Sequence, residues 1–175
     1  MDFTKLVLPD SVEVSGSYFK IHTGHPYWFR FAKILEQDKM YLVDFDHLYV
    51  DDKPTDKQAG VDALAAFFWE KKEVPRAEEG EECEQTLDYE LDADLLYSAF
   101  LQCYGIDLYE KEIHWHKVRA MIAGLIGTRL NEVMSYRLYN GNDKELKKMK
   151  RIWSLPVKMS DADKAELEAF EAQFK

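Results

Sequence analysis

The sequence predicts a mainly α fold, a compact multi-helix bundle with a small N-terminal β-hairpin. Apolar residues recur at three- and four-residue steps over most of the chain, as in Val61, Leu64 and Phe68, and this spacing is typical of amphipathic helices. Clear alternation of apolar and polar residues, which indicates strands, is found over residues 12–21. The 175 residues are 46% hydrophobic, which supplies a core and excludes wholesale disorder.

The first predicted element is the hairpin. Val12 and Val14 alternate with polar residues, residues 15–17 supply a Ser-Gly-Ser turn, and Phe19 and Ile21 alternate after it. An isolated hairpin is marginally stable in water. We therefore expect its apolar face to dock on the helices that follow.

A helix is predicted after the hairpin. Thr23 is the expected N-cap, and Pro26 falls in the first turn, where a missing N–H is harmless. The apolar side of this helix carries Trp28, Phe31 and Leu35. These large side chains should enter the core.

The secondary structure of the next segment is ambiguous, whereas that of the segment after it is clear. Residues 40–50 have helical spacing but also contain strand formers, and we favour a helix. Thr55 or Asp56 should cap the helix after it, whose apolar face ends in Phe68 and Trp69. Two bulky aromatic residues on such a face indicate core more often than a ligand pocket.

The chain is expected to form a single domain with four parts. Residues 75–86 are a Glu-rich linker, which should be solvated because its charges repel one another. It separates a hairpin-and-helix part, residues 1–74, from a helical part, residues 87–158. Residues 159–175 are predicted to form a last amphipathic helix that begins with a capping box.

Four helices are predicted between the linker and residue 158. The first ends at Gly105, a residue suited to a left-handed C-cap, and it places Cys103 on its apolar face. The second runs to about Gly124, and Thr128 caps the third. Pro156 stops the fourth.

The net charge of −10 is unevenly distributed. Residues 77–110 contain no Lys or Arg, whereas residues 111–158 have an excess of basic residues. This segregation is typical of complementary faces of one fold, and a charge-guided partner surface is the alternative. The lysines of residues 144–151 are expected to form an ordinary solvated helix face, so no nucleic-acid binding is predicted.

The cysteines and the hydropathy of the chain predict its cellular compartment. Cys83 and Cys103 have no metal-ligand spacing and are expected to be free thiols in a reducing compartment. The chain opens without a signal-peptide pattern, and no apolar run is long enough to cross a bilayer. A soluble, cytoplasmic protein without membrane partners is therefore expected.

Motifs for catalysis are missing. The chain has no GxGxxG, P-loop, nucleophile elbow or HExxH motif, so we predict no enzyme activity and no cofactor. Asp92 and Asp94 begin a helix, and a capping role explains them fully.

His114 and His116 could be read as a metal pair. Around them Ile113, Trp115 and Val118 have helical spacing, and residues two apart on a helix point about 200° apart. The two rings then could not close on one ion, so no metal site is predicted. A strand would place both histidines on one face, and in that case a metal site remains the alternative.

The second half of the chain carries a family resemblance. Its markers are residues 92–100 and 104–108, His114, Trp115, Gly124, Leu125, Arg137, Leu155 and Pro156. This pattern resembles the bacteriophage gene-product-fifteen family, and the first half looks similar in residues 14–21 and 65–69. The sequence departs from the family at His116, where a second aromatic residue is usual. Residues after Ser160 lie beyond the resemblance.

The resemblance implies a non-catalytic tail-assembly chaperone. Members are encoded by tailed phages and prophages, commonly just before the tape-measure gene. Such a chaperone would bind and solubilise the tape-measure protein before tail-tube polymerisation, with the tail-tube protein or an upstream chaperone product as further partners. It would act in the host-cell cytoplasm and be absent from the mature virion. Its oligomeric state is left open.

Five residues are the candidate partner contacts under this hypothesis. They are Trp115 and Trp153 as apolar contacts and Lys117, Arg119 and Arg137 as polar contacts. The alternative for both tryptophans is the protein's own core. The second functional hypothesis is a metal-dependent or nucleic-acid-acting phage protein centred on the two histidines of residues 114–116.

Overall fold

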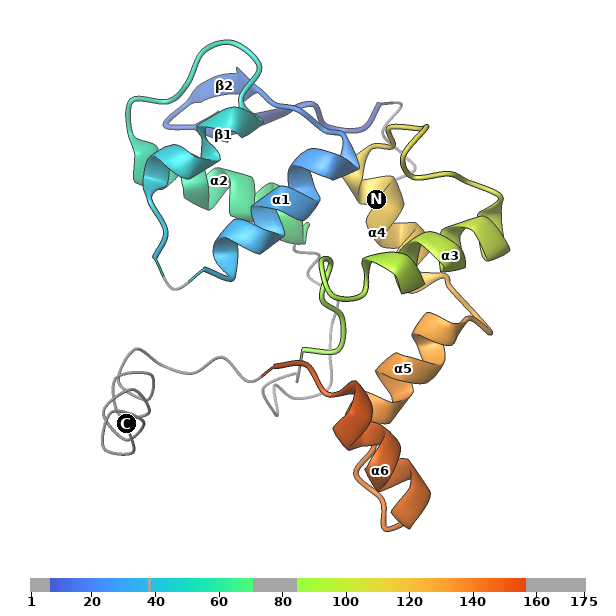
Figure 1. Cartoon of the computed structure of the whole chain (residues 1–175). Coiled ribbons are helices and arrows are strands. Elements are labelled where there is room, and N and C mark those ends of the chain that lie inside the picture. Colours follow the sequence, from blue (N-terminus) through green and yellow to red (C-terminus); the bar gives the residue numbers. More distant parts are fainter. Residues whose placement is uncertain (1–6, 38, 71–84, 157–175) are drawn as a thin grey trace, which may run out of the picture.

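The computed structural model describes residues 7–37, 39–70 and 85–156. These residues form helices and a two-stranded antiparallel sheet, which confirms the predicted helical fold with an N-terminal hairpin (Figure 1). The elements in chain order are β1 Ser11–Val14, β2 Ser17–Lys20, α1 His25–Leu35, the 3-10 helix η1 Leu42–Leu48, α2 Lys57–Trp69, α3 Ala93–Tyr104, α4 Trp115–Ala123, α5 Arg129–Leu138 and α6 Lys144–Trp153. The predicted C-terminal helix, and the predicted linker except for its last two residues, lie outside the described residues.

The hairpin forms at the predicted turn. Val12 pairs with Phe19 across the two strands. Between the strands, Ser15 and Gly16 have φ angles of 50° and 81°, and two successive positive values are typical of a type I′ hairpin turn. Val12 and Val14 are buried, and β1 lies against α2. The hairpin therefore docks its apolar face on a helix, as predicted.

Helix α1 begins one residue later than predicted. Its N-cap is Gly24, and Thr23 is not the cap. The reason is a tertiary pairing: the Thr23 carbonyl accepts a hydrogen bond from the Trp115 N–H at 2.7 Å, and the His25 N–H donates to the Ile113 carbonyl at 2.8 Å. The start of α1 is thus fixed by the segment that precedes α4.

The ambiguous segment after α1 is helical but tighter than an α-helix. It forms η1, in which Phe45 and Leu48 are buried. Leu42, at the start of η1, is exposed. The buried pair packs beside α1 and α2 and forms part of the hydrophobic core.

Helix α2 confirms its predicted cap and corrects its predicted face. The Asp56 carboxylate accepts a hydrogen bond from the Ala59 N–H at 3.0 Å, as a cap does. Trp69, however, is 54% exposed, so its assignment to the core was wrong. It is the last residue of α2, and Glu70 ends the helix in the left-handed conformation. Phe67 is buried instead.

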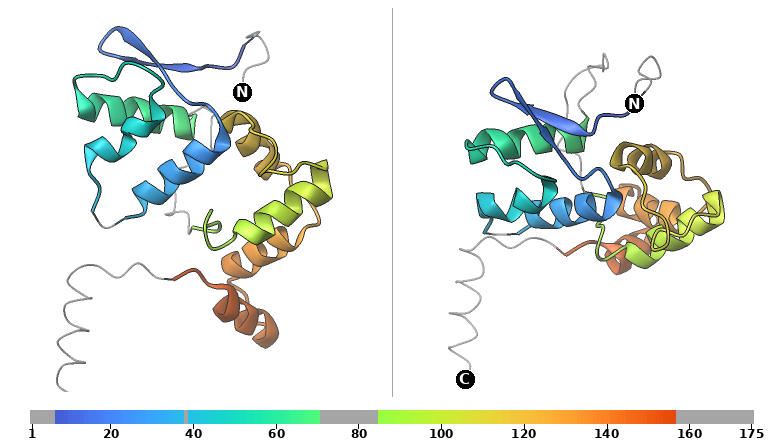
Figure 2. Two further views of the ribbon diagram at one scale, coloured as in Figure 1. Left: turned by 45° about the horizontal axis from the view of Figure 1, so that its top comes forward. Right: turned by 90° about the horizontal axis from the view of Figure 1, so that it is seen from above.

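The second half contains α3 to α6. Gly105 ends α3 with a φ of 61°, and the Thr128 side chain caps α5, both as predicted. Cys103 is exposed, so its predicted place in the core was wrong. Its thiol lies 3.8 Å from the Ile126 carbonyl, at the edge of the apolar face of α3, whereas Phe100 is buried and Tyr104 packs against the core. Figures 1 and 2 show α5 and α6 as a helical hairpin at one end of the molecule.

The core is built around aromatic rings from both halves. Trp28 and Trp115 have no exposed surface. The Trp28 ring stacks on Phe67 with centroids 4.6 Å apart, and the Trp115 ring stacks on Phe68 at 4.9 Å. Such pairs contribute about 0.5–1.5 kcal/mol each beyond their buried area. The N-terminal helices and α4 are therefore joined by one cluster.

Candidate partner-binding surfaces

The His114 to His116 segment differs from its predicted geometry. His114 is the N-cap of α4, with φ −54° and ψ 134°, so it precedes the helix. Its Nδ1 accepts the His116 main-chain N–H at 3.1 Å, and the two ring centroids are 5.1 Å apart. The prediction that the rings point away from each other was wrong, because helical phase applies only from Trp115 onward.

Both imidazole rings form hydrogen bonds with main-chain carbonyls. The Nε2 atom of His114 lies 2.9 Å from the Pro9 carbonyl, and Nε2 of His116 lies 2.9 Å from the Phe67 carbonyl. Burial lowers the pKa of His116, against the opposing effects of the Phe67 carbonyl and the Glu70 charge. Over residues 7–37, 39–70 and 85–156, no three His, Cys, Asp or Glu side chains converge on a point where a metal could bind. This geometry supports a packing role for the pair.

Side chains of α4 satisfy the last carbonyls of α2. The Trp115 Nε1–H donates to the Phe68 carbonyl at 3.0 Å, and Arg119 Nη1 donates to the same oxygen at 2.9 Å. The final carbonyls of a helix have no partner within it, and a cation near them is favourable. Together with His116 on the Phe67 carbonyl, α4 therefore caps α2.

Three of the predicted partner contacts thus lie on α4. Trp115 belongs to the core, which is the alternative that the sequence left open. Arg119 is partly buried and bound to α2, whereas Lys117 is exposed. The partner-binding role of these residues stays a prediction.

Arg137 is buried in an ion pair. Its guanidinium donates two hydrogen bonds to the Asp92 carboxylate, at 2.6 and 2.8 Å, and further bonds to the carbonyls of Thr86 and Trp153. Asp92 makes no cap hydrogen bond to α3. The prediction that capping explains Asp92 was therefore wrong, because Arg137, 45 residues away in sequence, binds its carboxylate.

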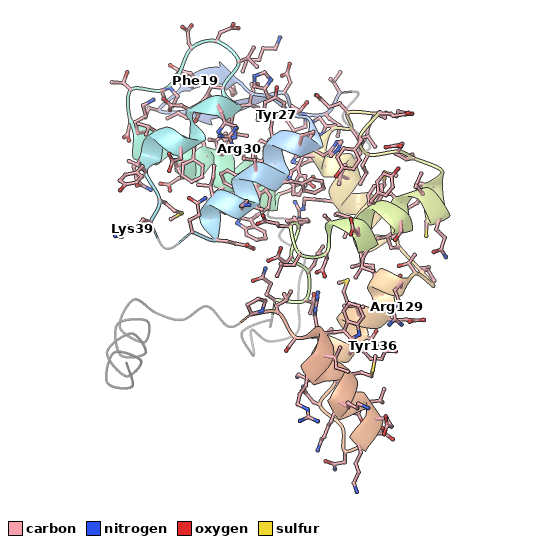
Figure 3. All side chains as sticks on the ribbon, viewed as in Figure 1. Phe19, Tyr27, Arg30, Lys39, Arg129 and Tyr136 are labelled. Atoms are coloured by element: carbon pink, nitrogen blue, oxygen red, sulfur yellow. The ribbon has the colours of Figure 1, made fainter. Side chains whose placement is uncertain are left out.

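Trp153 lies at the end of α6 and is half-buried. The Arg129 guanidinium is 5.3 Å from its ring centroid, and Figure 3 shows Arg129 projecting from α5. Figure 1 places α6 at the opposite end of the second half from the start of α4. The structure therefore brings Trp153 and Arg137 together but does not bring them to Trp115.

A half-open apolar hollow lies where α1 and α2 end. We call it the tryptophan hollow. Its volume is about 510 Å³, and it is lined by Ala32, Leu35, Glu36, Phe68, Trp69, Gln85, Thr86, Leu87 and Tyr89. Sequence reasoning missed it, because Trp69 continues an apolar helix face. The available signal was the charged residue Glu70 directly after it.

A second hollow, the tyrosine groove, lies between the start of α1 and α3. Its volume is about 270 Å³, and it is lined by His25, Pro26, Phe29, Tyr89, Ala93, Leu96, Tyr97, Leu108 and Tyr109. Tyr109 is 88% exposed. Its ring lies 5.6 Å from that of Tyr97. The polar residues that follow Tyr109 were a sequence signal of exposure.

Helix α6 offers a third surface, the basic arm. None of its residues is buried. Ile152 is 60% exposed, so the apolar edge of α6 is only partly covered by α5. Its exposed cations are Lys144, Lys147, Lys148 and Arg151.

Comparison with known proteins places the chain in a family. No helix in the described part of the chain has the length and apolar character needed to cross a membrane. No curated protein and no solved structure matches the chain. Residues 6–155, however, match the family described as Bacteriophage Gp15 protein. This match covers most of the sequence and includes the markers of the predicted resemblance up to Leu155, so the chain belongs to the Bacteriophage Gp15 protein family.

Proposed function

We propose that this phage protein is a non-catalytic tail-assembly chaperone that binds and solubilises the tape-measure protein before the tail tube polymerises. A tape-measure protein is a long, largely helical chain, and its apolar stripes favour aggregation until the tube encloses them. A small protein that covers such stripes would keep the chain available for assembly. Tail-tube subunits would later displace it in the host cytoplasm, so it would be absent from the mature virion.

The observation that carries this proposal is the tryptophan hollow. It is apolar and half-open, and Trp69 stands 54% exposed at its edge. Amphipathic helices bind such hollows by inserting apolar residues spaced three and four apart. Exposed tryptophans are frequent energetic centres of protein interfaces. The hollow therefore has the size and chemistry to hold the apolar ridge of a partner helix.

The predicted contacts on α4 support the hollow indirectly. Trp115 and Arg119 both bind the Phe68 carbonyl, and Phe68 lines the hollow next to Trp69. These two hydrogen bonds fix the end of α2, the helix that carries Trp69. Lys117 is exposed on the same helix and stays the candidate for a direct polar contact. The net charge of −10 favours solubility of a complex with an aggregation-prone chain.

The test is co-expression with the tape-measure protein of the same phage or prophage. We expect the chaperone to raise the soluble fraction of the tape-measure protein and to co-purify with it. Trp69→Ala should reduce co-purification at least about tenfold, since loss of a central interface tryptophan costs about 2 kcal/mol or more. Tyr41→Ala is the matched control, because Tyr41 is an exposed aromatic residue outside the hollow. Wild-type protein that neither binds nor solubilises its partner would falsify the proposal.

A further inference from the structure

We propose that copies of this chain associate head to tail, with α6 of one copy seated in the tyrosine groove of the next. The occupant of the groove is thus a second copy of the protein. Both surfaces lie in the described part of the chain. The proposal concerns the chain alone, so it is tested without a tape-measure protein.

The tyrosine groove has an acidic rim. The Asp107 carboxylate accepts hydrogen bonds from the Tyr97 hydroxyl at 2.9 Å and from the Tyr109 N–H at 2.8 Å, which places it between two groove tyrosines. Glu110 follows Tyr109 and is exposed. The hydrogen bond to Asp107 raises the pKa of Tyr97, together with burial and the charges of Asp107 and Glu110. The floor of the groove is apolar, so it suits an apolar side chain flanked by cations.

Helix α6 carries that combination. Lys144, Lys148 and Ile152 lie at four-residue steps and therefore form one row along the helix surface. All three are exposed. The row ends in an apolar side chain and has two cations behind it. Ile152 would enter the groove, while the lysines would face the acidic rim.

The contact must form between copies. Figure 1 shows α6 at one end of the second half of the chain, far from the loop between α3 and α4 that carries Tyr109. Groove and arm are different surfaces, so the contact is heterologous, and each added copy leaves one free groove and one free arm. One helix row covers much less than the roughly 800 Å² per partner of a standard interface. The association is therefore weak, reversible and sensitive to salt.

The test is sedimentation velocity of the full chain from micromolar to millimolar concentration. At low salt we expect the average mass to rise with concentration, and at about 0.5 M salt we expect it to return toward the monomer. Glu110→Lys should weaken association at least about tenfold, since it replaces an attraction by a repulsion. The double variant Lys144→Glu with Lys148→Glu should do the same. Asp52→Lys is the matched control, because Asp52 is exposed and lies outside both surfaces.

Mixing distinguishes a head-to-tail contact from any other. The Glu110→Lys variant keeps an intact arm, and the double lysine variant keeps an intact groove. Their equimolar mixture should form a 1:1 pair that does not grow further. Each variant should unfold at the same urea concentration as the wild type, which separates lost association from lost folding.

Several results would overturn the proposal. They are a wild-type chain that stays monomeric over the whole range, an association that strengthens with salt, a loss caused by only one of the two charge reversals, and a mixture that forms no pair. None of these results bears on tape-measure binding through the tryptophan hollow. The two proposals can therefore fail separately.

Discussion

The Arg137 guanidinium donates two hydrogen bonds to the Asp92 carboxylate, at 2.6 and 2.8 Å, and both side chains are buried. The pair joins the last turn of α5 to the start of α3. Arg137 also donates to the carbonyls of Thr86 and Trp153. It therefore links the end of α6 and the segment before α3 to α5. A planar, five-donor guanidinium suits this task better than an ammonium would.

Removal of one partner of this pair should be severe. We expect Arg137→Met to lower the free energy of unfolding by about 3–5 kcal/mol, because the buried Asp92 charge loses its cationic partner and keeps only the hydrogen bond from the Asp88 N–H. The double variant Arg137→Met with Asp92→Leu should recover much of that loss, since it removes the uncompensated charge as well. Urea unfolding followed by circular dichroism measures both. Equal destabilisation by the single and double variants would contradict this account.

The two tryptophans at the junction of α2 and α4 should respond differently to the same change. Trp115→Phe removes the hydrogen bond to the Phe68 carbonyl and leaves a cavity in the core, and we expect a loss of about 1–3 kcal/mol. Trp69→Phe alters an exposed ring and should change the free energy of unfolding by less than about 0.5 kcal/mol. Similar losses in the two variants would show that the junction is not packed as described.

The buried His116 should make stability depend on pH. Burial lowers its pKa, so the native state binds a proton less readily than the unfolded chain, whose histidines titrate near pH ~6.5. The stability that neutral His116 contributes is therefore fully present above about pH 6.5. It is lost as the pH falls from there toward the lowered pKa of the native state. His116→Gln keeps an N–H donor for the Phe67 carbonyl but does not titrate.

The measurement is the free energy of unfolding of wild type and His116→Gln between about pH 7.5 and 5.5. The variant should lose less stability as the pH falls, by up to about 1.4 kcal/mol per pH unit, which corresponds to one proton. Burial also lowers the pKa of His25 and His47, and both remain in the two proteins, so they cancel in the comparison. Identical pH dependence in the two proteins would reject the assignment to His116.

Cys103 should react in the folded protein. Its exposure predicts rapid labelling of a Cys83→Ser variant by a thiol reagent without denaturant. A core cysteine, as the helical pattern alone suggested, would react only after unfolding. Labelling rates with and without urea distinguish the two. Protection in the native state would mean that the last turn of α3 packs more deeply than the structure shows.

Local signals predicted much of the fold because the interactions involved are short in sequence. The hairpin turn depends on two adjacent residues with positive φ. The caps at Asp56, Thr128 and Gly105 depend on residues within one helical turn of each other. The periodic apolar pattern is likewise a property of single helices, and the family motif is a property of the sequence itself.

The candidate surfaces were harder to predict, because periodicity does not tell which part of an apolar face is covered. Trp69 continues the core face of α2 but lies past the point where the other helices reach. Cys103 lies at the edge of the apolar face of α3 and is exposed, although Tyr104 after it packs against the core. His114 was predicted to lie inside α4, but its extended main chain pairs with Gly24 and it stands before the helix.

The sequence by itself therefore determined the helical class, the N-terminal hairpin, several of the helix boundaries and membership of a phage protein family. The tertiary structure alone decided that Trp115 belongs to the core and Trp69 to the surface. It also decided that Asp92 binds Arg137 in place of a helix cap. The physical reason is range: caps and periodicity act within a few residues, whereas burial and ion pairing depend on which distant elements meet.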